Sequence, residues 1–393
     1  MWRQVLFFCV IGCLLIPSQA GAVVPLTHEG PQISAASAVL LDEKSGLMLW
    51  GKNPHLQRAP ASTTKILTAL LIAERCDLND LVQVSQRAAH TGGSSAYLHA
   101  GERLRVRDLL YGLLLVSGND AAVALAEHCA GSVEEFADLM NARVRQLGGY
   151  DSHFTNPHGL PDPEHYTTAY DLSLITRQAL RNPILAQIVA SRSETIPRTG
   201  GDGQQFLANR NRMLWSYPGA DGVKTGYTRA AGRCLVSSAT RAGRQVIAVV
   251  LGSAAIWDDS RTVLDFGFEA FDYCQLVARE EIVREIAVAG VVEPVPLAAR
   301  QGLVLPMWQG EQAAWEQNIQ IAEGIKAPLR AGQVLGQFQV SHRTTGNVVA
   351  VDLIVTKDVF RRPGLLTRAV RCFLGVWEGL YDRLPRRPVP NLG

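Results

Sequence analysis

The order of the expected secondary-structure elements constrains the fold of this chain more than any other feature of its sequence. Residues 36–50, ASAVLLDEKSGLMLW, contain two apolar runs joined by a glycine-containing turn, which predicts a β-hairpin. Residues 62–74 then place apolar side chains at helical spacing behind Ser and Thr residues that suit a helix start. A mostly helical pattern runs from about Val106 to Pro183, broken at residues 116–120 and 155–166. A hairpin and a group of helices therefore come first.

Strand-like segments return after this helical region. Residues 222–228, 233–240 and 244–253 predict three successive strands, and residues 260–274, SRTVLDFGFEAFDYC, predict a closing helix. This order predicts an α+β domain with one antiparallel sheet, ending near residue 275. Short strand-like runs with Gly and Pro turns follow, which predict a small all-β domain at residues 280–358. The 393 residues, 47% of them hydrophobic, suffice for two cores.

The two ends of the chain carry segments of a different kind. Residues 1–22 begin with Arg3, an apolar run and small residues, which is the layout of a secretory signal peptide. The mature protein is therefore expected to be exported to the periplasmic or extracytoplasmic face of the cell membrane. Residues 362–385 predict an amphipathic helix that suits a membrane interface, and docking on the chain's own β domain is the alternative. Its apolar face comprises Leu366, Val370, Phe373, Trp377, Leu380 and Leu384.

The charge and the cysteine content limit which partners and which redox chemistry can be expected. The chain has 38 basic and 36 acidic residues, and a net charge of +2 gives no indication of nucleic-acid binding. Loss of residues 1–22 would leave an odd number of cysteines, which excludes a complete disulfide framework. Cys76 and Cys129 each follow a helix-like segment and could pair in an oxidising compartment, whereas the alternative is a pair of small buried thiols.

Three short motifs, far apart in the chain, carry the residues best suited to chemistry. Ser62 precedes Lys65 by one helical turn, and Ser117 and Asn119 lie in a loop between two predicted helices. Lys224 opens a Lys-Thr-Gly sequence on a predicted strand. Only six lysines occur in the chain, so two of them within such motifs are unlikely to coincide by accident. The three motifs predict one site.

The chemistry of the first two motifs follows from what a serine nucleophile needs. A serine hydroxyl attacks poorly until a base removes its proton, and a residue three positions along a helix can supply that base. Lys65 must then be neutral part of the time, and both burial and the charge of Lys224 would lower its pKa. Ser117 could relay protons between the two amines, and Asn119 could orient Lys65 or a substrate amide. The alternative for the first motif is that Ser62 only caps the helix and Lys65 is solvated. The alternative for the second is that Ser117 and Asn119 are simple turn residues.

The third motif suits substrate binding. The backbone N–H groups of Ser62 and of Tyr227 could both donate to a developing oxyanion. Gly226 leaves room for a substrate that lies against the strand edge as an added strand, and Lys224 and Thr225 could hold a carboxylate. A hairpin turn is the alternative reading of residues 224–226.

The ordered set Ser-x-x-Lys, Ser-x-Asn and Lys-Thr-Gly resembles that of penicillin-binding proteins and class A β-lactamases. Residues 155–160, TNPHGL, and 219–228, GADGVKTGYT, extend the likeness to the exported D-alanyl-D-alanine carboxypeptidases of the penicillin-binding protein 5 type, peptidase family S11. The resemblance implies a β-lactamase-like D,D-peptidase domain at residues 30–276, then the small β domain and the C-terminal anchor. It also implies Ser62 as nucleophile, Lys65 as general base and Ser117 with Asn119 as the second motif. Lys224 would belong to the third.

A further residue comes from the resemblance alone. Arg261 falls near the place where the family has an arginine proposed to hold the substrate's terminal carboxylate, and a salt bridge on a helix surface is the alternative. His158 is expected to shape a loop beside the site.

The resemblance implies a reaction on the D-Ala-D-Ala end of peptidoglycan stem peptides. Ser62 would attack the penultimate carbonyl, expel D-alanine and form an acyl-enzyme that water hydrolyses, and β-lactams would acylate the same serine. No cofactor is required. A β-lactamase is disfavoured because no Glu-x-x-Leu-Asn segment follows the second motif. D,D-endopeptidase or transpeptidase activity, and a non-catalytic peptidoglycan- or β-lactam-binding protein, stay open. A zinc peptidase using His153, His158 and His165 is disfavoured by their spacing.

Overall fold

The computed structural model describes residues 30–198, 203–344 and 346–361. The expected signal peptide at residues 1–22 and the expected amphipathic helix at residues 362–385 lie outside the described residues. The described chain divides into two compact units. The first unit comprises the described residues up to Asp272, together with those of segments 306–309 and 344–347. The second unit comprises the other described residues after Asp272.

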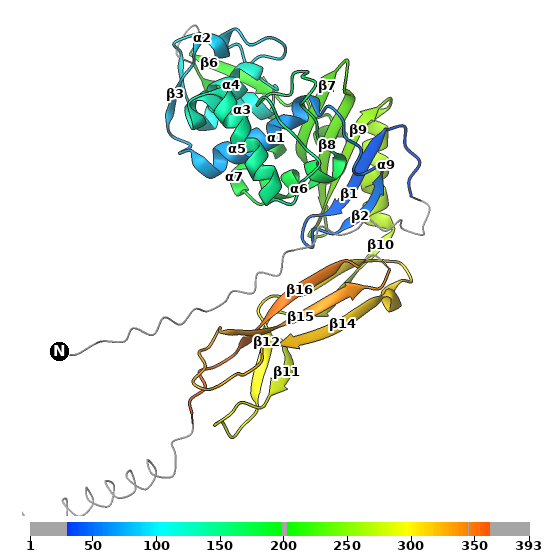
Figure 1. Cartoon of the computed structure of the whole chain (residues 1–393). Coiled ribbons are helices and arrows are strands. Elements are labelled where there is room, and N and C mark those ends of the chain that lie inside the picture. The colour runs from blue at the N-terminus through cyan, green and yellow to red at the C-terminus, as the bar shows by residue number, and fades with distance from the viewer. Residues whose placement is uncertain (1–29, 199–202, 345, 362–393) are drawn as a thin grey trace, which may run out of the picture. The chain divides into compact units, whose positions relative to one another are not determined.

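A five-stranded antiparallel sheet forms the centre of the first unit (Figure 1). The expected hairpin is present as β1 (Ser37–Asp42) and β2 (Met48–Lys52), and the three expected later strands are β7 (Ala220–Thr228), β8 (Gly232–Arg241) and β9 (Arg244–Ser253). Their order across the sheet is β2-β1-β9-β8-β7. The hairpin therefore joins strands that come some 200 residues later, with Ser37 opposite Leu251, and β7 forms one edge.

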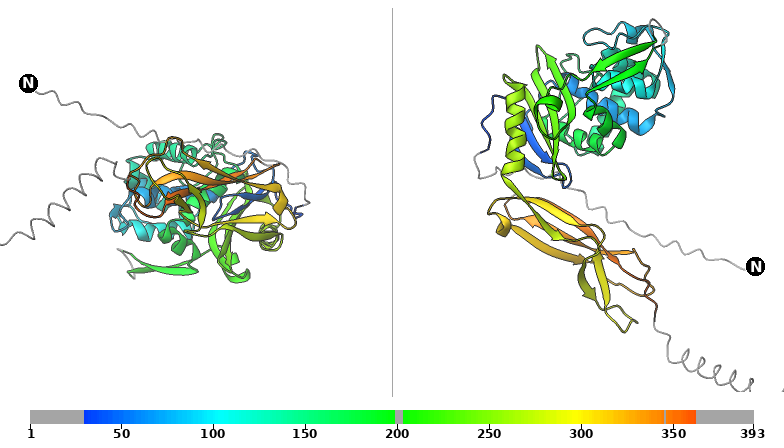
Figure 2. Two further views of the ribbon diagram at one scale, coloured as in Figure 1. Left: turned by 90° about the horizontal axis from the view of Figure 1, so that it is seen from below. Right: turned by 180° about the vertical axis from the view of Figure 1, so that it is seen from behind.

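Helices cover both faces of this sheet (Figure 2). On one face lie α1 (Lys65–Arg75), α3 (Val106–Leu114), α4 (Asn119–Ala130), α5 (Val133–Gln146), α6 (Ala169–Leu180) and α7 (Pro183–Ala190). Alternate residues of a strand point to opposite faces, so Val39 and Leu41 of β1 pack into the helical core. Leu40 faces the other way, against Gly267 of α9 (Ile256–Glu269). The α+β architecture predicted from the sequence is confirmed.

Two local predictions differ from the structure. The closing helix begins earlier than expected and ends at Glu269, because residues Phe271–Val277 form strand β10, which pairs with β13 (Leu303–Trp308). A second hairpin, β5 (Ser193–Pro197) and β6 (Gln204–Ala208), was not predicted. Only one residue of each strand, Ile196 and Leu207, is buried, so the hairpin's apolar signal is weak. The short elements β3 (Leu81–Gln83), α2 (Gln86–Ala89), β4 (Arg103–Arg105) and α8 (Met213–Ser216) complete the first unit.

The second unit is all-β, as predicted. Besides the β10–β13 pair, it contains β11 (Ile282–Ile286), β12 (Val295–Ala299), β14 (Trp315–Ile321), β15 (Val334–His342) and β16 (Val348–Val355). They form one antiparallel sheet in the order β11-β12-β16-β15-β14. Within the described ranges, no helix is long and apolar enough to cross a membrane.

Candidate active site

Ser62 lies in a strained turn that enters α1. The turn is a short 3-10 helix, η1 (Ala61–Thr64), which runs directly into α1 at Lys65. Ala61 has a φ of +50°, which is unfavourable for a side-chain-bearing residue and is the kind of strain found at functional sites. The loop that contains His158 presses on this turn, because a Cβ at Gly159 would lie 1.8 Å from the Ala61 carbonyl oxygen. Only glycine fits there.

Lys65 is fully buried at the start of α1 and its amine is held by three hydrogen bonds. The Nζ atom donates to Ser62 Oγ at 3.1 Å, to Asn119 Oδ1 at 2.7 Å and to the backbone carbonyl of His158 at 2.7 Å. The Ser-x-x-Lys motif and the Ser-x-Asn motif therefore meet at this nitrogen. A solvated Lys65 is excluded, since its side chain is 0% exposed.

Burial lowers the pKa of both lysines. Desolvation lowers the pKa of Lys65 well below its ordinary value, and the nearby charge of Lys224 lowers it further. Desolvation also lowers the pKa of Lys224 to about 7, helped by the positive charge of Arg210. These directions confirm the two causes expected from the sequence for Lys65. At neutral pH each amine has a neutral fraction far larger than that of a surface lysine.

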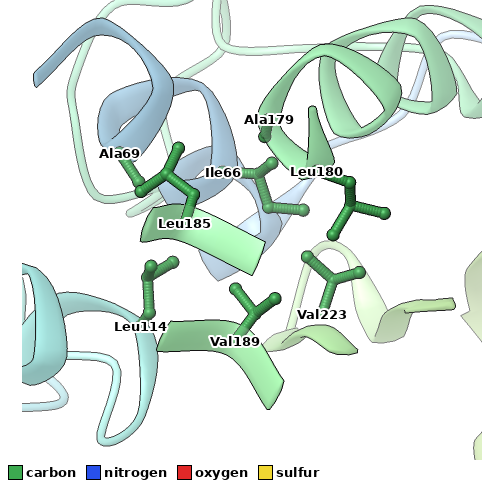
Figure 3. Close-up of a pocket in the computed structure, with 8 residues that line it drawn as sticks. All are labelled: Ile66, Ala69, Leu114, Ala179, Leu180, Leu185, Val189 and Val223. Atoms are coloured by element: carbon green, nitrogen blue, oxygen red, sulfur yellow. The ribbon is translucent and has the colours of Figure 1, made fainter. Parts of the chain in front are cut away.

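A small apolar cavity lies within the helical core of the first unit, beside β7 (Figure 3). Ile66 and Val223, which neighbour Lys65 and Lys224 in the chain, both point into it. All the residues that line it are apolar and belong to the hydrophobic core of the first unit. Its full lining is Ile66, Ala69, Leu114, Ala179, Leu180, Leu185, Val189 and Val223.

Strand β7 brings the Lys-Thr-Gly motif against the serine turn. A Cβ at Gly226 would lie 3.1 Å from the Ser62 backbone nitrogen and 3.2 Å from the Pro60 carbonyl oxygen. Gly226 therefore packs directly against the turn that carries Ser62. Lys224 is buried and donates to the Thr225 carbonyl oxygen at 2.9 Å, whereas the Tyr227 side chain is exposed.

Ser117 and Asn119 mark the start of α4. Ser117 has a φ of +67°, and its buried Oγ has no hydrogen-bond partner among the described residues. The expected relay contact from this hydroxyl to either lysine is therefore not formed here. Asn119 is the first residue of α4 and donates from Nδ2 to the Gly92 carbonyl oxygen at 2.6 Å. The following residue, Asp120, accepts from Ser95 Oγ at 2.6 Å and thereby fixes the neighbouring loop.

The three loop histidines do not gather as metal ligands. His158 contributes its backbone carbonyl to Lys65, while its Nδ1 accepts from the Leu160 N–H at 3.1 Å. His165 Nε2 lies 2.9 Å from Thr64 Oγ1, and burial lowers the pKa of His165 to about 4. In the part of the chain that the structure describes, no group of three or more His, Cys, Asp or Glu side chains could hold a metal ion.

Most of the first unit matches a known protein family. Residues 25–255 match the family model described as D-alanyl-D-alanine carboxypeptidase, peptidase S11. The chain belongs to this carboxypeptidase family. Residues 271–361 match a second model, the C-terminal domain of penicillin-binding protein 5, so the resemblance inferred from the motifs is confirmed.

Relatives of this S11 family match over most of their length. The D-alanyl-D-alanine carboxypeptidase DacF of Bacillus subtilis is 34% identical over 90% of this chain and 91% of the relative. The crystal structure of penicillin-binding protein 5 from Haemophilus influenzae is 31% identical, with a TM-score of 0.71 over 85% of this chain and all of that one. A mutant of the Streptomyces K15 DD-transpeptidase is 33% identical, with a TM-score of 0.58 over 61% of this chain.

In this S11 peptidase hydrogen bonds bring Ser62, Lys65 and Asn119 together, and Gly226 lies against the serine turn. The structure does not bring Arg261 to them. Arg261 lies on α9, on the sheet face opposite α1, and its Nη1 is 3.9 Å from Asp258. That contact is the helix-surface ion pair considered as the alternative.

Two site groups escaped the sequence analysis. The His158 carbonyl carries no side-chain signal, and Arg210 lies in a segment without a motif. Arg210 donates to Ser94 Oγ at 2.9 Å, and its charge reaches both lysines. A cation so close to Lys224 is a second candidate for holding a substrate carboxylate.

Proposed function

We propose that this chain is a serine-type D-Ala-D-Ala carboxypeptidase that removes the terminal D-alanine from peptidoglycan stem pentapeptides through an acyl-enzyme on Ser62. One observation carries the proposal. A buried, hydrogen-bonded lysine amine with a lowered pKa lies 3.1 Å from a serine hydroxyl, which is the arrangement of a base-activated nucleophile. Family membership supplies the substrate class.

Acylation begins when neutral Lys65 accepts the proton of Ser62 Oγ as that oxygen attacks the penultimate D-alanine carbonyl. Asn119 and the His158 carbonyl hold the resulting ammonium in place, because both accept from Nζ at 2.7 Å. The backbone N–H groups of Ser62 and Tyr227 stabilise the oxyanion. A proton then passes to the leaving nitrogen, and D-alanine departs.

The remaining polar groups suit substrate binding and proton delivery. Lys224, together with Thr225 and the newly found Arg210, would bind the terminal carboxylate. The Ser117 hydroxyl, which has no partner among the described residues, is available to hydrogen-bond the leaving amine. Water then hydrolyses the acyl-enzyme, with Lys65 again as base. A β-lactam carbonyl in the same position would acylate Ser62 and stay bound.

Mass spectrometry of a synthetic stem pentapeptide after incubation tests this function. Loss of one alanine from the pentapeptide, with no other cut, is expected. Products that are joined to an added amine acceptor would instead favour a transpeptidase, the activity named for the Streptomyces K15 structure. Cleavage only within a cross-linked peptide would favour an endopeptidase.

Export and membrane association form part of the same proposal. The substrate lies outside the cytoplasm, which agrees with the signal-like residues 1–22, and residues 362–385 would hold the enzyme peripherally at the membrane. Deleting residues 364–393 is expected to move the protein from the membrane fraction to the soluble fraction. Acylation by a fluorescent penicillin should be retained as the control for folding. Sedimentation with membranes that is unchanged by the deletion would contradict the anchor.

A further inference from the structure

Two thiols meet at the ends of the helices that carry the catalytic motifs. Cys76 caps α1, with its N–H bonded to the Ile72 carbonyl oxygen at 3.0 Å, and Cys129 lies in the last turn of α4. The two side chains are hydrogen-bonded to each other as free thiols. Both are half-buried, so reagents can reach them from solvent.

The opposite ends of the same helices hold the site together. Lys65 opens α1 and Asn119 opens α4, and their side chains are joined by the 2.7 Å hydrogen bond. Each helix spans roughly 15 Å between its catalytic residue and its cysteine, because an α-helix rises about 1.5 Å per residue. The two helices therefore lie side by side along their length and are in contact at both ends. A covalent link at one end constrains the geometry at the other.

We propose that Cys76 and Cys129 are a modification site, a dithiol that forms a reversible intramolecular disulfide tying α1 to α4. The link would close a loop of roughly 50 residues, which includes α3 and the Ser117 loop, and cross-links over such long loops restrict the unfolded chain strongly.

The surroundings give the two sulfurs different roles. The hydrogen bond from the Cys76 thiol and the positive charge of Arg75 lower the pKa of Cys129 to about 7. The hydrogen bond to Cys129 and burial raise the pKa of Cys76. Cys129 therefore has the larger thiolate fraction of the two at neutral pH, and a thiolate is the attacking species in disulfide exchange.

The oxidant is a disulfide from outside the protein. Cys129 attacks one of its sulfur atoms, the reagent's S–S bond breaks, and the first reagent thiolate leaves. Cys76 then loses its proton and attacks the Cys129 sulfur, which expels the second thiolate. The two protein thiols lose two electrons and two protons, and the reagent gains them as two thiols.

The test oxidises the full chain with oxidised glutathione at neutral pH, blocks remaining thiols with N-ethylmaleimide and maps peptides without reduction. A peptide pair linking residues 76 and 129 is expected, with no glutathione retained on either. Cys274→Ser, which alters a half-buried cysteine on β10, serves as the matched control and should give the same link. Cys76→Ser should stop at a mixed disulfide between Cys129 and glutathione, whereas Cys129→Ser should react far more slowly at position 76.

Melting provides a second measurement that needs no catalysis. Oxidised wild-type protein should melt about 5–10 °C above the reduced protein, and neither Cys76→Ser nor Cys129→Ser should respond to reductant. The proposal is overturned if both thiols are still alkylated after oxidation, if linked peptides join two copies of the chain, or if melting is the same in both redox states.

Discussion

Replacing Ser62 by alanine is expected to abolish covalent labelling by a fluorescent penicillin and to lower kcat on the pentapeptide by about 10⁴-fold or more. The hydroxyl is the only group of this serine that can form the acyl bond. Its removal should leave the fold intact, since Ser62 is only partly buried and its turn is held by Thr63 and Thr64, whose hydroxyls donate to the Pro60 and Ala61 carbonyl oxygens.

A serine elsewhere on the same unit gives the control for this variant. Ser216 is exposed on α8 and bonds only locally to the Arg212 carbonyl oxygen, so Ser216→Ala should label at the wild-type rate. Binding of a penicillin without a covalent bond should survive in Ser62→Ala. If this variant still forms the covalent adduct, another residue is the nucleophile and the assignment of the site fails.

Replacing Lys65 by methionine is expected to slow acylation by about 10³- to 10⁴-fold, the contribution typical of a general base. Methionine keeps most of the buried volume and removes only the amine that contacts Ser62, Asn119 and His158. Lys44 is exposed, so Lys44→Met should acylate normally. Stopped-flow mixing with penicillin measures the acylation rate of each variant. A Lys65→Met rate within a few fold of wild type would rule out this residue as the base.

The pH dependence of acylation should separate a base from a merely structural lysine. Burial and the charge of Lys224 lower the pKa of Lys65, so the neutral, proton-accepting amine exists at a lower pH than in an exposed lysine. The rate should therefore fall as the pH drops through the pKa of Lys65. Lys224→Met removes a positive charge that opposes protonation of Lys65, and its acid limb should lie at a higher pH. An acid limb at the wild-type position in Lys224→Met would show that the two amines are not coupled.

The parts of the fold that were predicted correctly are those with strong apolar patterns. Strands β8 and β9 are almost continuously buried, and such runs leave little ambiguity in the sequence. The β5–β6 hairpin was not predicted because most of its side chains are exposed. Phe271–Cys274, the first part of β10, was assigned to the preceding helix because its apolar residues continue that run. Propensity cannot recognise a strand that is specified by its distant partner β13.

The part of the candidate site that could be predicted is the part whose side chains belong to sequence motifs. Ser62, Lys65, Asn119 and Lys224 were identified from the resemblance of three ordered motifs to a known family, with residue chemistry and spacing in support. The structure joins Ser62, Lys65 and Asn119 by hydrogen bonds. The carbonyl of His158 could not be predicted, since every residue carries one and only the folded loop selects it. For Arg261 the sequence left two readings open, a carboxylate-binding arginine and an ion pair on a helix surface. Its Nη1 lies 3.9 Å from Asp258, one turn earlier on the same helix, which is the ion-pair geometry.

The pairing of β1 with β9 has a consequence for how the molecule is made. Ser37 finds its partner only when Leu251 is available, so a ribosome must synthesise most of the first unit before the sheet can close. Until then the apolar hairpin has one unsatisfied edge, which is prone to wrong association. Non-local pairing of this kind also folds slowly. The export proposed above would need the newly made chain to stay unfolded, and this connectivity keeps the first strand unpaired for most of synthesis.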